Sequence, residues 1–154
     1  MKILNINLDK RRIGFILLTA ITILIFICVF ILLMNNRTIE MTTENYTTIL
    51  KNAHLDISKY AGKKVHTSGY IFRAPDFSKT QFVIARDMLI SDDSANIVGF
   101  LCEYPYAHEF ENNIWVEIYG TIIKGDYYGP IPIIKVNNIN KITTPNDTFV
   151  YPPN

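Results

Sequence analysis

The sequence predicts an all-β protein in which a small five-stranded barrel follows a single membrane-spanning helix and a short helical linker. Two observations carry this prediction. Residues 13–34 are apolar without a charge or a proline, and from Val65 onward apolar residues alternate with polar ones in five segments. The chain has 154 residues. The part beyond the apolar segment, about 110 residues, is enough for one small domain with one core.

The apolar segment from Ile13 to Met34 has the length of a transmembrane helix. As a helix its 22 residues would extend about 33 Å, slightly more than the roughly 30 Å hydrocarbon core of a bilayer. Thr19 and Thr22 lie one turn apart, and we expect their hydroxyls to bond their own helix backbone. The segment is therefore predicted to cross the lipid bilayer.

Basic residues predict the orientation of this helix. Four of them lie in residues 1–12, whereas only Arg37 closely follows the segment. The positive-inside rule leaves residues 1–12 in the cytoplasm and the C-terminal domain outside it, in a single-pass protein of the plasma membrane. A cleaved signal peptide is the main alternative, but its apolar region would be shorter. Residues 34–36 also offer no cleavage site of the small-x-small type.

Charge and cysteine content exclude one class of partner and one kind of crosslink. The net charge is +1, but residues 1–40 hold five of the 15 basic and two of the 14 acidic residues, so the remainder carries −2. An acidic domain is a poor partner for phosphate backbones, and we expect no nucleic acid. Cys28 lies in the apolar segment and Cys102 in a predicted strand, which leaves no intrachain disulfide. We expect Cys102 to be a small buried thiol.

The regions that flank the barrel are predicted to be less regular. Residues 35–61 form a juxtamembrane linker with one short helix, which is capped by Thr42 or Thr43 and runs through Asn52. The barrel domain spans residues 62–143. Residues 144–154 include three prolines and are predicted to be an extended tail, packed only through Phe149 and Tyr151.

Five alternating segments and one helical turn define the barrel. The predicted strands are residues 65–72, 81–89, 97–104, 114–122 and a last one from Ile131 or Ile133 to Ile142, with the helical turn at 105–110. Gly69 and Gly120 lie mid-strand, where a small closed sheet must bend sharply. Periodicity alone also allows a small sandwich, but a short helix between the third and fourth of five strands is the order of an OB-like barrel.

Six motifs in one order carry a resemblance to a known family. They are Arg73–Phe77, Gln81–Arg86, Val98–Pro105, Trp115–Ile122, Pro132–Val136 and Val150–Pro152. Together they resemble the outer domain of the YcgQ-like bacterial membrane proteins, described as predicted subunits of a two-component permease complex. The resemblance covers about Gly62 to Pro152. It implies an OB-like domain outside the cytoplasm that works beside a multi-span permease.

The chain departs from the pattern of this family in two places. Members usually carry several membrane segments ahead of this domain, whereas this sequence offers one. Many also carry a Cys-Cys pair shortly after the Ala-Arg of the second strand, but residues 87–93 contain no cysteine. We therefore expect neither a soft-metal site nor a cofactor.

Candidate metal ligands and nucleophiles form no recognisable pattern. Asp87, Asp92 and Asp93 are predicted in the loop between the second and third strands, and Glu103 follows one strand later. Their spacing matches no calcium loop, so we interpret them as solvated acids. The three histidines are His54, His66 and His108, and no pair lies at helical ligand spacing. Zinc bound by His66 or His108 with Cys102 and an acid would need the fold to bring these residues together. Without a catalytic motif, we expect no enzyme.

Aromatic and basic side chains form the candidate partner-binding surface. Its residues are Tyr70, Phe72, Arg73, Arg86, Trp115 and Tyr119. Trp115 and Tyr119 share the parity opposite to the core on the fourth strand, and such rings can stack on a ligand or bury against a protein. The alternative, that these rings complete the packing of the barrel, is equally open.

These observations predict a non-enzymatic accessory subunit of a permease complex, held in the membrane by residues 13–34. The alternative is a free-standing tethered module that binds a small ligand or a metal cation. A hydrolase with unrecognised residues is a third and weaker hypothesis.

Overall fold

The computed structural model describes residues 10–35, 37–91 and 94–153. The chain divides into two compact units, Met1–Arg37 and Thr38–Asn154. Asp92 and Asp93, two of the acids considered as metal ligands, lie outside the described residues.

The first unit contains helix α1 (Lys10–Asn35). Within the described part of the chain, α1 is the one helix that is long and apolar enough to cross a membrane, over Arg12–Ile31. The hydroxyls of Thr19 and Thr22 donate to the carbonyls of Ile16 and Thr19, at 2.9 and 2.8 Å. The predicted bonding of both threonines to their own helix is therefore confirmed.

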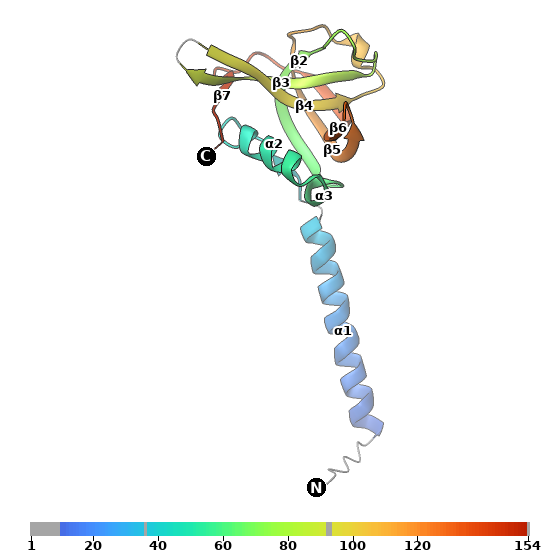
Figure 1. Ribbon diagram of the computed structural model, residues 1–154. Coiled ribbons are helices and arrows are strands. Elements are labelled where there is room, and N and C mark those ends of the chain that lie inside the picture. Colours follow the sequence, from blue (N-terminus) through green and yellow to red (C-terminus); the bar gives the residue numbers. More distant parts are fainter. Residues whose placement is uncertain (1–9, 36, 92–93, 154) are drawn as a thin grey trace. The chain divides into compact units, whose positions relative to one another are not determined.

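The second unit is built on a closed barrel of five strands (Figure 1). The strands are β2 (Lys64–Phe72), β3 (Gln81–Ser91), β4 (Ser94–Glu103), β5 (Trp115–Asp126) and β6 (Pro130–Lys141). They pair in the order β2-β5-β6-β4-β3, and β3 pairs again with β2 to close the barrel. The β4–β6 pair is parallel and the others are antiparallel. A 3-10 turn, η1 (Ala107–Glu109), lies between β4 and β5. The predicted all-β, OB-like barrel is confirmed.

The alternation predicted along β2 and β5 is seen in the burial of their residues. Along β2 the buried positions are every second residue from Val65, and along β5 they include Val116, Ile118 and Ile122. The two mid-strand glycines lie where backbones approach closely. A Cβ on Gly69 would lie 2.5 Å from the carbonyl oxygen of Ala85, and one on Gly120 would lie 2.6 Å from that of Lys135. Any side chain there would clash with the neighbouring strand.

Two short strands join the barrel from its flanking regions, the linker and the tail, where the sequence predicted no strand. Strand β1 (Ile39–Glu40) runs parallel to β2, and β7 (Phe149–Val150) runs parallel to β3. In the tail Val150 is fully buried, whereas Phe149 and Tyr151 are 40% and 60% exposed. The prediction that the tail packs only through these two rings is wrong. Strand pairing turns alternate side chains to opposite faces, and the register with β3 buries Val150.

Two helices precede the barrel strands. Helix α2 (Tyr46–Leu55) begins later than predicted, with Asn45 instead of Thr42 or Thr43 at its N-cap. Helix α3 (Ile57–Tyr60) is a single turn that Asp56 caps. Tyr46 is fully buried in the barrel core, and its hydroxyl donates to the carbonyl of Ile84 at 2.6 Å. Burial raises the pKa of Tyr46. Helix α2 is thereby anchored on β3.

Candidate binding pocket beside His66 and Arg86

Two cross-strand aromatic pairs organise the outer face of the β2–β5 ladder. His66 lies opposite Tyr119, and Tyr70 lies opposite Trp115. The rings of His66 and Tyr119 stack at 4.1 Å between centroids and 4° between planes. Those of Tyr70 and Trp115 meet edge to face at 6.0 Å and 63°. Such pairs are the usual unit of stabilisation between neighbouring strands.

The Tyr70–Trp115 pair belongs to a group that we call the Arg86 cluster, formed by the buried Arg86 and Trp115 and the half-buried Tyr70. Arg86 is only 3% exposed, and its guanidinium carbon lies 4.8 Å from the Trp115 ring centroid. Desolvation lowers the pKa of Arg86. In the part of the chain that the structure describes, no carboxylate lies within 4 Å of this guanidinium.

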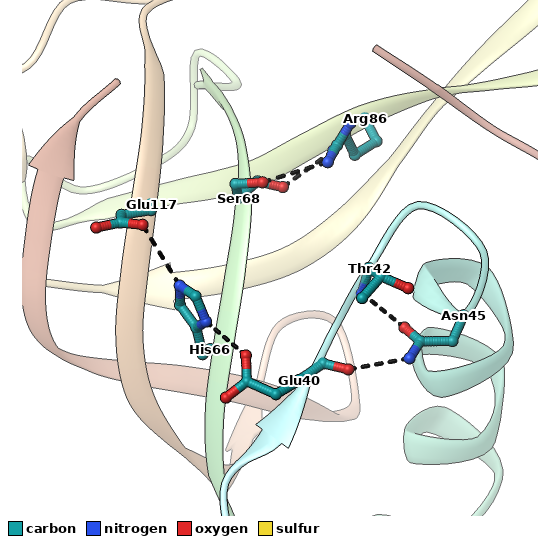
Figure 2. A network of polar contacts seen from close by, with 7 residues as sticks. All are labelled: Glu40, Thr42, Asn45, His66, Ser68, Arg86 and Glu117. Atoms are coloured by element: carbon teal, nitrogen blue, oxygen red, sulfur yellow. Dashed lines mark hydrogen bonds and ion pairs between the residues drawn. The ribbon is translucent and has the colours of Figure 1, made fainter. Parts of the chain in front are cut away.

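Neutral oxygens satisfy most of the guanidinium donors instead. Nε and Nη2 of Arg86 donate to the carbonyl and the hydroxyl of Ser68, at 3.0 and 3.2 Å (Figure 2). Nη1 donates to the carbonyls of Asp147 and Thr148 in the C-terminal tail, at 2.9 and 3.4 Å. Arg86 therefore joins β3 to β2 and to the segment that leads into β7.

Tyr70 extends this cluster to an acid that the sequence suggested as a metal ligand. Its hydroxyl donates to Oδ1 of Asp87 at 2.7 Å. Desolvation, followed by this hydrogen bond to a carboxylate, raises the pKa of Tyr70. Asp87 thus serves as the acceptor of a half-buried phenol.

The His66–Tyr119 pair lies in a more open group that we call the His66 cluster, formed by Glu40, His66, Glu117 and Tyr119. Nδ1 of His66 lies 2.6 Å from a carboxylate oxygen of Glu40, and Nε2 lies 3.5 Å from one of Glu117 (Figure 2). Only the imidazolium form carries a proton on both ring nitrogens. The charged form of His66 therefore satisfies both contacts.

Glu40 is held in place through its backbone. The side-chain amide of Asn45 donates to the Glu40 carbonyl at 2.9 Å, and its oxygen accepts from the backbone N–H of Thr42 at 2.8 Å (Figure 2). The N-cap residue of α2 therefore fixes the chain between β1 and the helix.

A pocket of about 440 Å³ lies between the two clusters. It is lined by residues 40–44, 66–68, Arg86, Glu117 and Ile142. Glu40, Glu44 and Glu117 contribute three carboxylates, against one guanidinium at Arg86 and the ring of His66. The pocket can hold a small polar molecule, and its charge favours one that carries a positive group.

The structure places the six residues of the predicted partner surface at different depths. Arg86 and Trp115 are buried, because each covers the other and the tail covers Arg86. Tyr70, Phe72 and Arg73 are half-buried. Arg73 donates to the side chain of Asn112 at 2.9 Å and to the carbonyl of Ala107. Tyr119, at 39%, is the most exposed of the six residues.

The other candidate ligands remain apart. Within the described residues, no group of three or more His, Cys, Asp and Glu side chains is placed to hold a metal ion. Nδ1 of His54 lies 2.9 Å from the carbonyl of Leu50 on its own helix. Cys102 is fully buried, and burial raises the pKa of its thiol. Its predicted identity as a buried thiol is confirmed.

Sequence reasoning missed the acids that flank His66. Glu40 lies 26 residues before it in a segment predicted to be a linker. Glu117 shares the parity of Trp115 and Tyr119 on its strand, but its position beside His66 depends on the β2–β5 register. One signal in the sequence could have paired these residues: His66 and Glu117 lie on the same face of two neighbouring strands, β2 and β5.

Comparison with known proteins places the chain in a family. The family model described as the DUF1980 C-terminal domain matches residues 30–152. UPF0703 protein YcgQ from Bacillus subtilis (strain 168) is 23% identical over 122 residues, which cover 76% of this chain and 42% of YcgQ. The chain thus spans less than half the length of that relative. Neither description names a reaction, a ligand or a partner.

A solved structure, "OBody AM3L15 bound to hen egg-white lysozyme", is similar over 58% of this chain and 84% of that one. Its sequence identity is 12% and its TM-score is 0.39.

Proposed function

The chain belongs to the DUF1980 C-terminal domain family, and we propose that it is a non-enzymatic accessory subunit of a membrane transport complex. In this proposal α1 spans the plasma membrane, and the barrel lies outside the cytoplasm beside a multi-span permease. The observation that carries the proposal is the apolar stretch Arg12–Ile31 of α1, whose side chains are exposed along its length. A lipid bilayer gives such a surface a stable environment.

The charges around α1 support the outward orientation of the barrel. Basic residues precede the apolar stretch, and this asymmetry favours a cytoplasmic N-terminus. The barrel then works at the membrane surface, next to the proteins that cross it.

The chemistry of the described barrel residues supports a role in binding. Cys102 is buried with a raised pKa, which makes its thiol a poor nucleophile. His66, the histidine in the pocket, is held between two carboxylates, and its ring stacks on Tyr119. These contacts hold side chains in place and present a polar surface.

The pocket between the two clusters supports a second candidate, a tethered module that binds a small ligand without a permease. Its volume of about 440 Å³ and its mixed charges suit a small cationic or zwitterionic molecule.

Crosslinking in whole cells tests the first proposal. A photoreactive amino acid at Tyr119 of the full chain is expected to capture a multi-span membrane protein that also co-purifies with the untreated chain in mild detergent. The matched control carries the same group at Lys51, an exposed residue of α2. Equal capture from both positions, or capture of soluble proteins alone, would count against the proposal.

A reporter fused after Asn154 tests the orientation separately. It should be accessible from outside intact cells. A reporter reached only from the cytosol would overturn the proposed placement of the barrel. Calorimetric binding of a small zwitterion such as glycylglycine to the purified full chain, with no membrane partner captured, would favour the second candidate.

A further inference from the structure

A second surface of the barrel carries features that the pocket does not use. The turn between β5 and β6 bears Tyr127 and Tyr128, and the loop between β2 and β3 bears Asp76 and Phe77. The hydroxyls of both tyrosines donate to Oδ2 of Asp76, at 2.8 Å from Tyr127 and 3.3 Å from Tyr128. These four residues, which we call the tyrosine platform, therefore join two loops that are about fifty positions apart in the sequence.

The rings of the platform support one another. Phe77 and Tyr127 meet edge to face, with centroids 5.5 Å apart and planes at 80°. Tyr127 and Tyr128 meet in the same way at 4.8 Å and 70°. The Tyr128 ring is therefore positioned by a neighbouring ring at its side and by Asp76 at its hydroxyl.

Tyr128 is unusually open for a ring that is held in this way. It is 88% exposed, more than any other large apolar side chain in the described part of the chain. Its backbone adopts a φ of 53°, a left-handed conformation that is uncommon for an aromatic residue. The tight turn that joins Asp126 to Pro130 accounts for this backbone conformation.

The charge beside the ring is negative. The hydrogen bond from Tyr127 holds the pKa of Asp76 below its usual value, so Asp76 is an exposed carboxylate. The same bond raises the pKa of Tyr127, so its phenol stays a donor. The platform thus presents an aromatic face next to an anionic hydrogen-bond acceptor.

We infer that the tyrosine platform binds a neutral oligosaccharide. The C–H groups of a pyranose ring pack on an aromatic face, and its hydroxyls donate to a neighbouring carboxylate. A phosphate-bearing chain would be repelled by Asp76, and residues 41–154 already carry −2. An apolar peptide helix would need a groove, whereas the platform centres on one ring, that of Tyr128, which is 88% exposed.

This inference concerns a surface distinct from the pocket beside His66. The outward orientation under the proposed function gives it a biological setting, since glycans belong to the cell envelope. Binding itself is measured on the purified chain, so its failure is distinguishable from a failure of the membrane topology.

Titration of the full chain with tetra-N-acetylchitotetraose tests the inference. The chain should be held in a phosphocholine detergent, because sugar-headed detergents would compete for the site. Calorimetry and saturation-transfer NMR are expected to show binding, with the strongest transfer to the sugar ring protons. Tyr128→Ala should weaken binding about tenfold or more, since the ring face is lost.

Matched variants separate the ring from its hydroxyl. Tyr128→Phe keeps the aromatic face and should retain most of the affinity, whereas Asp76→Asn should weaken binding several-fold. Tyr106→Ala removes another exposed tyrosine, 56% exposed and outside the platform, and should leave binding unchanged. Fluorescence of Trp115, the single tryptophan, verifies that each variant is folded.

Three outcomes would overturn the inference. The wild-type chain could fail to bind the tetrasaccharide, Tyr128→Ala could bind as well as the wild type, or oligothymidylate could bind the platform more tightly than the sugar. The last result would assign the surface to single-stranded nucleic acid.

Discussion

The Arg86 cluster and the His66 cluster begin from the same pattern and end in different environments. Each is built on an aromatic pair that joins β2 to β5. The two pairs lie four residues apart along each strand. Each cluster places a nitrogen-bearing side chain, Arg86 or His66, over the face of an aromatic ring. Arg86 is buried, however, while the His66 cluster opens on a pocket.

The two clusters differ in burial because different segments of the chain lie over them. The tail delivers the carbonyls of Asp147 and Thr148 to Arg86 and pairs β7 with β3. At the other pair, β1 brings Glu40, whose side chain is 60% exposed. A covered polar group becomes part of the structure, whereas an uncovered one stays available to a ligand. We expect mutations in the Arg86 cluster to affect stability and those in the His66 cluster to affect it little.

Arg86→Met should have the largest effect. The change leaves the carbonyls of Ser68 and Asp147 without a donor, so we expect the free energy of unfolding to fall by about 3 kcal/mol. The melting temperature should then fall by roughly 10 °C. Thermal unfolding of the full chain in detergent, followed by Trp115 fluorescence, measures this shift.

Lys124→Met, at an exposed position of β5, is the control for Arg86→Met. A shift for Arg86→Met no larger than that of this control would show that the Arg86 cluster does not stabilise the fold.

Val150→Ala tests the tail itself. The side chain is fully buried, so its truncation should cost about 2 kcal/mol of unfolding free energy in denaturant titrations. Tyr151→Ala, next along the chain and 60% exposed, should cost less than about 1 kcal/mol. The reverse order of effects would mean that the tail packs through its rings, as the sequence alone predicted.

Tyr70→Phe tests the pH dependence of the buried cluster. The pKa of Tyr70 is raised in the folded chain, so the phenol stabilises the fold fully below the unfolded pKa of about 10. This contribution is lost progressively as the pH rises from there toward the folded value. At neutral pH the variant should lose about 1 kcal/mol with the Asp87 hydrogen bond.

Above about pH 10, the difference between Tyr70→Phe and the wild type should shrink. Unfolding in urea at neutral and alkaline pH measures it. Tyr46 and Cys102 also have raised pKa values, so the variant keeps part of the alkaline sensitivity. A constant difference at all pH values would contradict the assignment to Tyr70.

His66→Gln should have the smallest effect on stability. Its partners Glu40 and Glu117 are at least one third exposed, and contacts between exposed charges contribute about 1 kcal/mol or less. Added salt should reduce the difference between the variant and the wild type, because it screens these contacts. A loss as large as that of Arg86→Met would show that the two clusters are equivalent.

Local pattern was enough to predict most of the barrel. The alternation along β2 and β5 predicted both strands. The mid-strand Gly69 and Gly120 were predicted to mark sharp bends, and the structure shows that neighbouring backbones approach closely there. The candidate site was predicted less well. The pattern predicted Trp115 and Tyr119 on the parity opposite to the core of their strand, but periodicity does not say whether another segment covers such a residue, and Trp115 is buried.

The sequence by itself determined the apolar helix, the five strands and their facing residues, because helix length and strand alternation depend on neighbours along the chain. Only the tertiary structure decided that the tail buries Arg86, that Glu40 meets His66, and that Tyr127 and Tyr128 meet Asp76. These contacts join residues that are 26 to 61 positions apart. They depend on strand register and barrel closure, which bring distant segments together and leave no periodic trace in the sequence.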